Sequence, residues 1–153
     1  MRPTTYRRPL YRLLLLCLAV VAGLTGCQRG EGKVSALNED VLATPDHSVP
    51  SPSGRYVLKV LAEKHDGEKL ARFQVLNGEG SVSYEDGTKY SLRHTTYFLW
   101  ADDIDQVWVY SGDVGTSFWQ VDENGTWTEH DRTSEQAEVP TFLKRARPQF
   151  FGT

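Results

Sequence analysis

Cysteine is almost absent from this chain of 153 residues. The two cysteines, Cys17 and Cys27, lie near the N-terminus, so residues 28–153 contain no disulfide, no thiolate nucleophile and no thiolate metal ligand. A domain without cross-links must be stabilised by a buried apolar core. Aromatic residues can supply it, because each buried ring removes about 150–250 Å² from water. The chain has 4 Trp, 7 Tyr and 6 Phe.

Long apolar runs are equally scarce. The longest is Leu13–Leu24, and its 12 residues fall short of the ~20 that a transmembrane helix needs. The segment before it has no acidic residue but holds four arginines, Arg2, Arg7, Arg8 and Arg12. A positive segment followed by a short apolar core predicts an export signal over residues 1–26.

The signal closes on Leu24-Thr25-Gly26-Cys27, which resembles the lipobox of bacterial lipoproteins. The obligatory Cys of that family supplies the thiol nucleophile that accepts the lipid. The resemblance implies diacylglycerol on Cys27, cleavage before Cys27 and, often, acylation of the new amino group, for example by palmitate. Two or more acyl chains hold a protein stably at a membrane. Gln28 resembles the class sorted to the outer membrane of Gram-negative bacteria, so we expect a lipid-anchored protein of the cell envelope.

The charge balance changes once the signal is removed. The four signal arginines leave 13 basic residues against 20 acidic ones, a net charge of −7. This acidic balance argues against nucleic acid as a partner, because nucleic-acid binding rests on basic residues that neutralise phosphates. We expect the partners to be the membrane, through the lipid on Cys27, and another envelope protein.

Residues 27–52 have the composition of a lipidated N-terminus followed by a flexible tether. They contain glycine and proline with scattered charge and show no clear period of 2 or 3.6. The globular domain is expected over residues 53–153. Its apolar and β-branched segments recur every 8–12 residues or so, which is typical of antiparallel β-sheet proteins. We therefore predict a mainly β fold, a small sheet or sandwich of about six or seven strands.

Four dipeptides of turn-forming residues separate the predicted strands: Asp66-Gly67, Asn77-Gly78, Asp86-Gly87 and Asn124-Gly125. The expected strands cover 55–62, 69–76, 81–84, 88–95, 106–110, 116–121 and 126–130, and residues 97–100 form a short apolar run that is expected to be buried. The C-terminal segment 140–146 has the composition of a short helix, with Pro140 in its first turn. Phe142 and Leu143 are expected to pack that helix on the sheet.

The candidate interface residues are Trp108, Tyr110, Asp113 and Trp119. In the strand around them, strict alternation places Val107 and Val109 on one face and Trp108 and Tyr110 on the other. If the valines face the core, the two aromatic rings face outward, where Trp and Tyr are typical anchors of binding interfaces. The alternative is that both faces of this strand are buried.

Other polar groups give weaker patterns. The acidic run from Asp102 to Asp105 is rich in the oxygen ligands of calcium but lacks the spacing of an EF-hand loop, so a solvated turn is the simpler interpretation. A Ser-His-Asp set can be written from Ser111, His94 and Asp103, yet their sequence spacing gives it no support. We predict no catalytic residue, no metal site and no cofactor.

Three function classes follow. The first is a non-enzymatic, lipid-anchored protein-binding or accessory module of the cell envelope. The second is a periplasmic immunity lipoprotein against an antibacterial toxin. The third is a cell-wall glycan binder or hydrolase. We expect the first, because neither catalytic nor metal-binding spacing stands out in the sequence.

Overall fold

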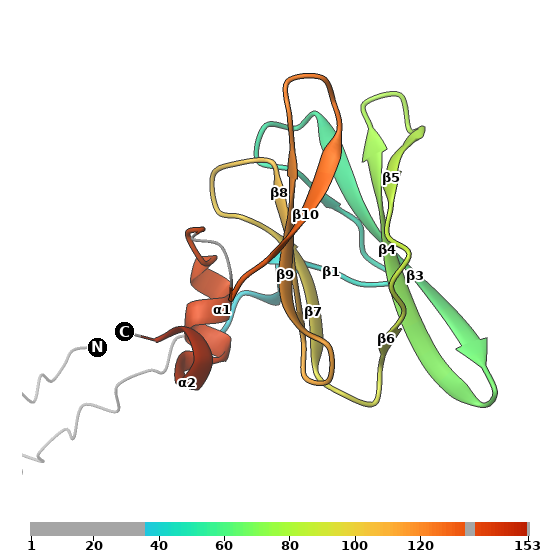
Figure 1. Ribbon diagram of the computed structural model, residues 1–153, viewed down its shortest axis with the longest axis vertical. Helices are drawn as coiled ribbons and strands as arrows, with labels where there is room; N and C mark the ends of the chain where they lie inside the picture. The colour runs from blue at the N-terminus through green and yellow to red at the C-terminus, as the bar shows by residue number, and fades with distance from the viewer. Residues whose placement is uncertain (1–35, 134–136, 153) are drawn as a thin grey trace, which may run out of the picture. The chain divides into compact units, whose positions relative to one another are not determined.

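A computed structural model describes residues 36–133 and 137–152 of the chain (Figure 1). Within them the protein is mainly β, with two antiparallel five-stranded sheets and two short helices near the C-terminus. The predicted β architecture is confirmed. In the described part of the chain, no helix is long and apolar enough to span a membrane. The predicted signal peptide and the lipidation site at Cys27 lie outside the described residues.

The first sheet is built mostly as a meander. Its strands, in spatial order, are β1 (Leu42–Ala43), β7 (Thr96–Trp100), β8 (Gln106–Ser111), β9 (Gly115–Val121) and β10 (Trp127–Asp131). From β7 onward each strand pairs with the next one along the chain. Strand β1 is contributed from far away in the sequence and pairs with β7.

The second sheet is built around one long hairpin. Its strands are β2 (Val49–Pro50), β3 (Tyr56–His65), β4 (Glu68–Asn77), β5 (Val82–Glu85) and β6 (Tyr90–Ser91). The order is β2-β3-β4-β5, and β6 also pairs with β4. In Figure 1 the β3–β4 hairpin runs diagonally across the side of the molecule away from the helices.

Three of the ten strands found in residues 36–133 and 137–152 have only two residues. The other seven have four or more, which matches the six or seven strands that the sequence predicts. The short strands correct the expected tether, however. Because β1 pairs with β7 and β2 pairs with β3, residues 42–43 and 49–50 belong to the two sheets, and the folded body starts before Ser53.

The hairpin turns were predicted with one error. Asp66 and Gly67 join β3 to β4 with φ angles of 49° and 83°, and positive φ at both positions is the type I′ turn that matches the twist of the strands. Asp86-Gly87 does not reverse the chain, because β5 and β6 pair with the same strand, β4. The predicted strand 88–95 is consequently reduced to the two residues of β6.

The main core lies between the two sheets. Its largest members come from both sheets: Phe73 of β4 packs edge-on against Trp119 of β9, with ring centroids 4.9 Å apart, and both side chains have no exposed surface. Alternate residues of each strand feed this layer, as period-2 burial requires. The members on the first sheet include Phe98, Trp100, Val107, Val109 and Trp127.

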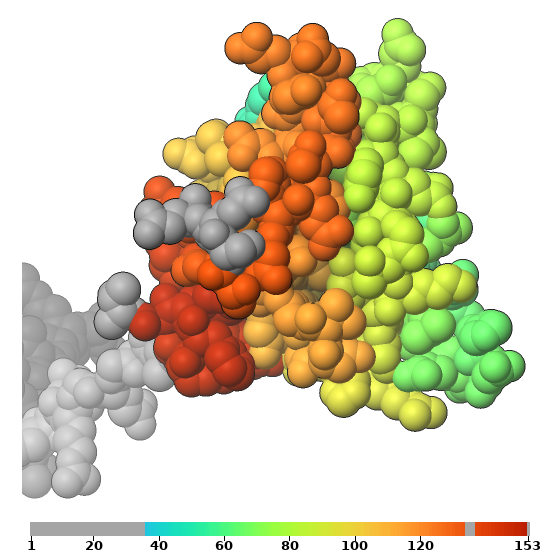
Figure 2. Space-filling view, viewed as in Figure 1, coloured from blue at the N-terminus to red at the C-terminus, as the bar shows by residue number. Residues whose placement is uncertain are grey.

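A second apolar cluster covers the other face of the first sheet. It is closed by α1 (Thr141–Ala146) and α2 (Pro148–Phe151), drawn in red beside β7–β9 in Figures 1 and 2. Phe142 and Leu143 are buried there, as predicted. Between the two helices the guanidinium of Arg147 lies 5.2 Å and 5.4 Å from the rings of Tyr97 and Tyr110. Such cation–π contacts hold the helical segment on the sheet.

Candidate functional site

Three of the four predicted interface residues are buried. Trp108 and Trp119 have no exposed surface and Tyr110 has 9 %. The predicted alternation is correct, because Val107 and Val109 face the core between the sheets while Trp108 and Tyr110 face the opposite side. That side is covered by the C-terminal helices, so the prediction of an exposed aromatic pair is wrong and the alternative, in which both faces of the strand are buried, is confirmed. Trp119 faces the core between the sheets, where its indole N–H donates to the Tyr84 hydroxyl at 2.9 Å.

The fourth residue, Asp113, is exposed in the β8–β9 turn. Its carboxylate accepts a hydrogen bond from the Ser111 hydroxyl, and that bond lowers the pKa of the Asp113 carboxyl. His94 lies beside this turn, with its Cβ 3.5 Å from where a Cβ on Gly112 would stand. Asp103 lies before β8 and Ser111 ends it, so β8 separates them by ~17 Å along the strand. The Ser-His-Asp set is therefore not assembled.

Two carboxylates of the acidic run after β7 form hydrogen bonds to distant parts of the chain. Asp102 accepts hydrogen bonds from the backbone N–H and hydroxyl of Thr141 at 2.9 and 2.7 Å, which fixes the start of α1. Asp105 accepts from the Ser53 hydroxyl at 2.5 Å and from Arg55 Nη2 at 3.0 Å. The predicted solvated turn is confirmed for Asp102 and Asp103, which are exposed, whereas the Asp105 side chain is largely buried.

Asp86 is a buried carboxyl that the sequence did not single out. It has 3 % exposed surface, and its Oδ2 has no hydrogen-bond partner in the described part of the chain. Burial raises the pKa of the Asp86 carboxyl, although hydrogen bonds from Thr88 and Tyr90 oppose that rise. Its side chain helps to fix the β5–β6 connection where the sequence predicted a turn. Since it opens onto no pocket described here, we assign it a structural role.

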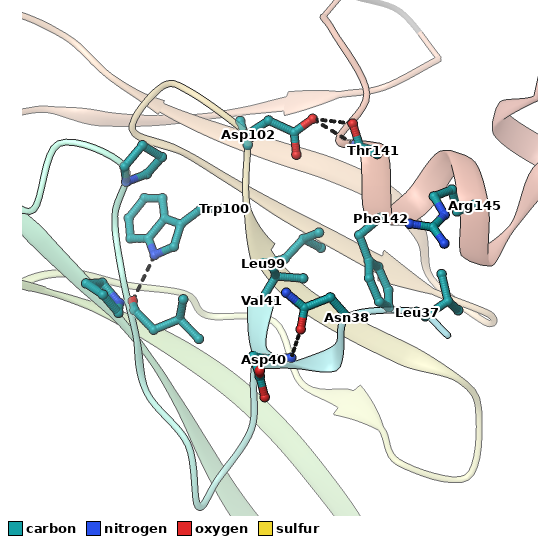
Figure 3. Close-up of a pocket in the computed structure, with 14 residues that line it drawn as sticks. Leu37, Asn38, Asp40, Val41, Leu99, Trp100, Asp102, Thr141, Phe142 and Arg145 are labelled. Atoms are coloured by element: carbon teal, nitrogen blue, oxygen red, sulfur yellow. Dashed lines mark hydrogen bonds between the residues drawn. The ribbon is translucent and has the colours of Figure 1, made fainter. Parts of the chain in front are cut away.

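One concavity formed by the described residues is an open pocket of about 460 Å³ (Figure 3). Ligand pockets typically have volumes of about 300–1,000 Å³ and mostly apolar walls. Three separate parts of the chain form it: the N-terminal segment before β3, the end of β7 and helix α1. The apolar residues that line it are Leu37, Val41, Val49, Pro50, Pro52, Leu99, Trp100, Ala101 and Phe142.

The most buried residues that line the pocket lie at the end of β7 and directly after it. Leu99, Trp100 and Ala101 have 1 %, 6 % and 6 % exposed surface. The indole N–H of Trp100 donates to the backbone oxygen of Val49 at 2.9 Å, so the polar atom of the ring is already satisfied. What this wall offers to a ligand is therefore carbon surface.

The rim of the pocket is polar. Asn38, Asp40, Asp102, Thr141 and Arg145 contribute to it. Asp102 is held by Thr141, as the dashed lines in Figure 3 show, and Arg145 lies beside Phe142 on the side away from Trp100. Two carboxylates and one guanidinium give the rim a net negative formal charge. No three His, Cys, Asp or Glu side chains gather as a metal centre anywhere in the described residues.

Sequence reasoning missed this pocket because it took residues 36–52 for a tether. The signal that was available is local: Asn38 is a good N-cap residue, and its side chain accepts from the backbone N–H of Asp40 at 3.2 Å. This cap starts a short 3₁₀ helix, Glu39–Val41, that supplies part of the wall.

The chain matches no protein-family model, no curated protein and no solved structure.

Proposed function

We propose that this chain is a non-enzymatic, lipid-anchored protein-binding module of the cell envelope. The anchor is the lipid on Cys27 implied by the lipobox resemblance. The observation that carries the binding role is the apolar pocket between Leu37–Val41, the end of β7 and α1. Buried apolar walls with a few polar groups at the rim are typical of binding sites.

The anchor is tested by changing its cysteine. Cys27→Ser should abolish incorporation of a radiolabelled or clickable fatty acid, because the hydroxyl cannot replace the thiol as lipid acceptor. The matched control is Cys17→Ser, which removes the other cysteine of the chain and should leave labelling unchanged. Labelling that persists in Cys27→Ser would show that the lipid sits elsewhere or that the export signal is of another kind.

The binding role is tested by capture with and without the pocket. The full lipidated chain is isolated from gently solubilised envelopes, and co-purifying proteins are identified by mass spectrometry. Val41→Trp, at a pocket residue that is 36 % exposed, should fill the pocket and lose a stoichiometric partner. Val114→Trp places the same ring on the β8–β9 turn, where Val114 is 57 % exposed, and should retain it. A partner retained by both variants would place the binding surface outside the pocket.

The immunity reading is the second candidate, and one observation favours it. The net charge of −7 expected for residues 27–153 complements a basic toxin. An immunity protein should bind one incoming toxin very tightly, and its deletion should harm cells only beside toxin-producing neighbours. An accessory module should instead co-purify with resident envelope proteins. A capture experiment that yields no co-purifying protein would therefore favour the immunity hypothesis.

A further inference from the structure

We propose that the pocket receives an apolar side chain from an extended, basic segment of a partner protein. This inference rests on the proposed binding function and adds the chemistry of the partner. Three features of the described residues carry it: the apolar depth of the pocket, the charge of its rim, and the way β7 continues past β1.

The depth of the pocket selects an apolar group. Leu99, Trp100 and Ala101 are the most buried residues that line it, and the backbone oxygen of Val49 accepts from the Trp100 indole. A polar side chain placed there would lose its hydration without gaining a partner from this wall, which costs free energy. An aliphatic or aromatic side chain loses nothing of that kind and gains from its burial.

The rim selects the charge. Asp40 lines the pocket and is exposed, and its carboxylate has no hydrogen-bond or ion-pair partner among the described residues. Asp102 adds a second carboxylate, of which Oδ2 is bound by Thr141. The one cation of the rim, Arg145, stands across the pocket from Trp100 in Figure 3. Lysine or arginine beside the inserted group would be attracted here, whereas a fatty acid or a phospholipid headgroup would meet a rim of net negative charge.

The end of β7 favours an extended peptide over a free small molecule. Strand β1 begins at Leu42, opposite Leu99, so its pairing with β7 stops one residue short of Trp100. The backbone N–H of Ala101 donates to the backbone oxygen of Gln106 on the β8 side, so alternation turns the backbone groups of Trp100 toward the β1 side, one residue beyond the Leu42–Leu99 pair. A partner strand added there would extend the sheet by β-augmentation and direct one side chain into the pocket.

The test uses the full chain in detergent and three synthetic peptides. The probe is acetyl-Ala-Lys-Leu-Lys-Ala-amide; one comparison peptide has Glu for both Lys, and the other has Ser for Leu. Binding is followed by ¹H–¹⁵N NMR, with the indole and backbone N–H signals of Trp100 as reporters. We expect the probe to bind about tenfold more tightly than either comparison peptide. The shifted signals should map to Leu99, Trp100 and Phe142.

The variants distinguish specific binding of the basic peptide in the pocket from non-specific binding. Asp40→Asn should weaken the probe about fivefold and flatten its salt dependence. Val41→Trp should abolish binding, and Val114→Trp should leave it unchanged. Equal affinity for the Lys and Glu peptides, shifts that map elsewhere, or no binding by the probe would each overturn the inference. If envelope capture still yields a partner that Val41→Trp loses, the binding function stands and only the basic-segment chemistry fails.

Discussion

Trp108→Ala is expected to lower the free energy of unfolding by about 3–5 kcal/mol, the range for large aromatic truncations in a core. Trp108 has no exposed surface and stacks on Phe118 with ring centroids 5.1 Å apart. Its truncation removes this contact and opens a cavity beneath Phe142 and Leu143 in the cluster under the helices. Urea unfolding followed by circular dichroism measures the loss.

The indole nitrogen adds to this loss. It donates to Gln106 Oε1 at 2.8 Å, and Gln106 itself is buried. Without the donor, the buried amide oxygen is left unpaired, which costs about 1–3 kcal/mol. Trp108→Phe therefore isolates the hydrogen bond: it keeps most of the ring surface and should destabilise by a smaller amount, within that range.

Phe150→Ala is the matched control. Phe150 is also aromatic and lies in the same C-terminal region, but it is 63 % exposed. Its truncation should change stability by less than about 0.5 kcal/mol. Equal stability of Trp108→Ala and the unchanged protein would mean that Trp108 is a surface residue after all. Because Trp108 is buried, it should not contribute to a binding surface. A Trp108→Ala chain that still folds should therefore retain its partner.

The long strands were predictable because alternation and turn chemistry act over short distances. β3 and β4 have ten residues each and meet in full register at the Asp66-Gly67 turn, so pattern and turn agree. Strands β1, β2 and β6 have two residues each. Two residues cannot show a period, and their pairing depends on segments far away in the sequence. This is why residues 42–50 resembled a tether.

The assignment of side chains to the two faces of β8 was predictable, but the helices that cover the second face were not. Alternation separates Val107 from Trp108 correctly, yet it does not say whether a helix lies over the second face. That depends on tertiary contacts such as Arg147 against Tyr97 and Tyr110. The pocket escapes prediction for the same reason, because Leu37, Trp100 and Phe142 become neighbours only after folding.

Asp105→Ala is expected to lower the free energy of unfolding by about 2–3 kcal/mol at neutral pH, the scale for hydrogen bonds to a charged group. The Asp105 side chain is only 5 % exposed and accepts from the Ser53 backbone N–H at 3.1 Å as well as from the Ser53 hydroxyl and Arg55. These bonds fasten the β2–β3 turn of the second sheet to the β7–β8 loop of the first. Removing the carboxylate leaves the donors on Ser53 and Arg55 without their hydrogen-bond acceptor.

Acid should produce the same loss in the unchanged protein. Burial raises the pKa of the Asp105 carboxyl, but hydrogen bonds from Ser53, Ser51 and Arg55 together outweigh burial and leave that pKa below its ordinary value. A carboxyl with a lowered pKa stabilises the fold above the unfolded-state pKa of about 3.9. That contribution is lost as the pH falls through the lower pKa of the folded state. Unfolding curves at several pH values between about 2 and 7 measure it.

Asp103→Asn provides the control for this pH dependence, because Asp103 is exposed in the same loop. Asp105→Asn should be less stable than Asp103→Asn at pH 7, and the gap should narrow below the unfolded-state pKa of about 3.9 and close as the pH falls through the lowered pKa of the folded Asp105 carboxyl. A gap that stays constant down to pH 2 would mean that its ionisation is not what the Ser53 and Arg55 donors recognise. Since Pro52 lines the pocket next to Ser53, loosening this turn should also weaken any ligand bound there.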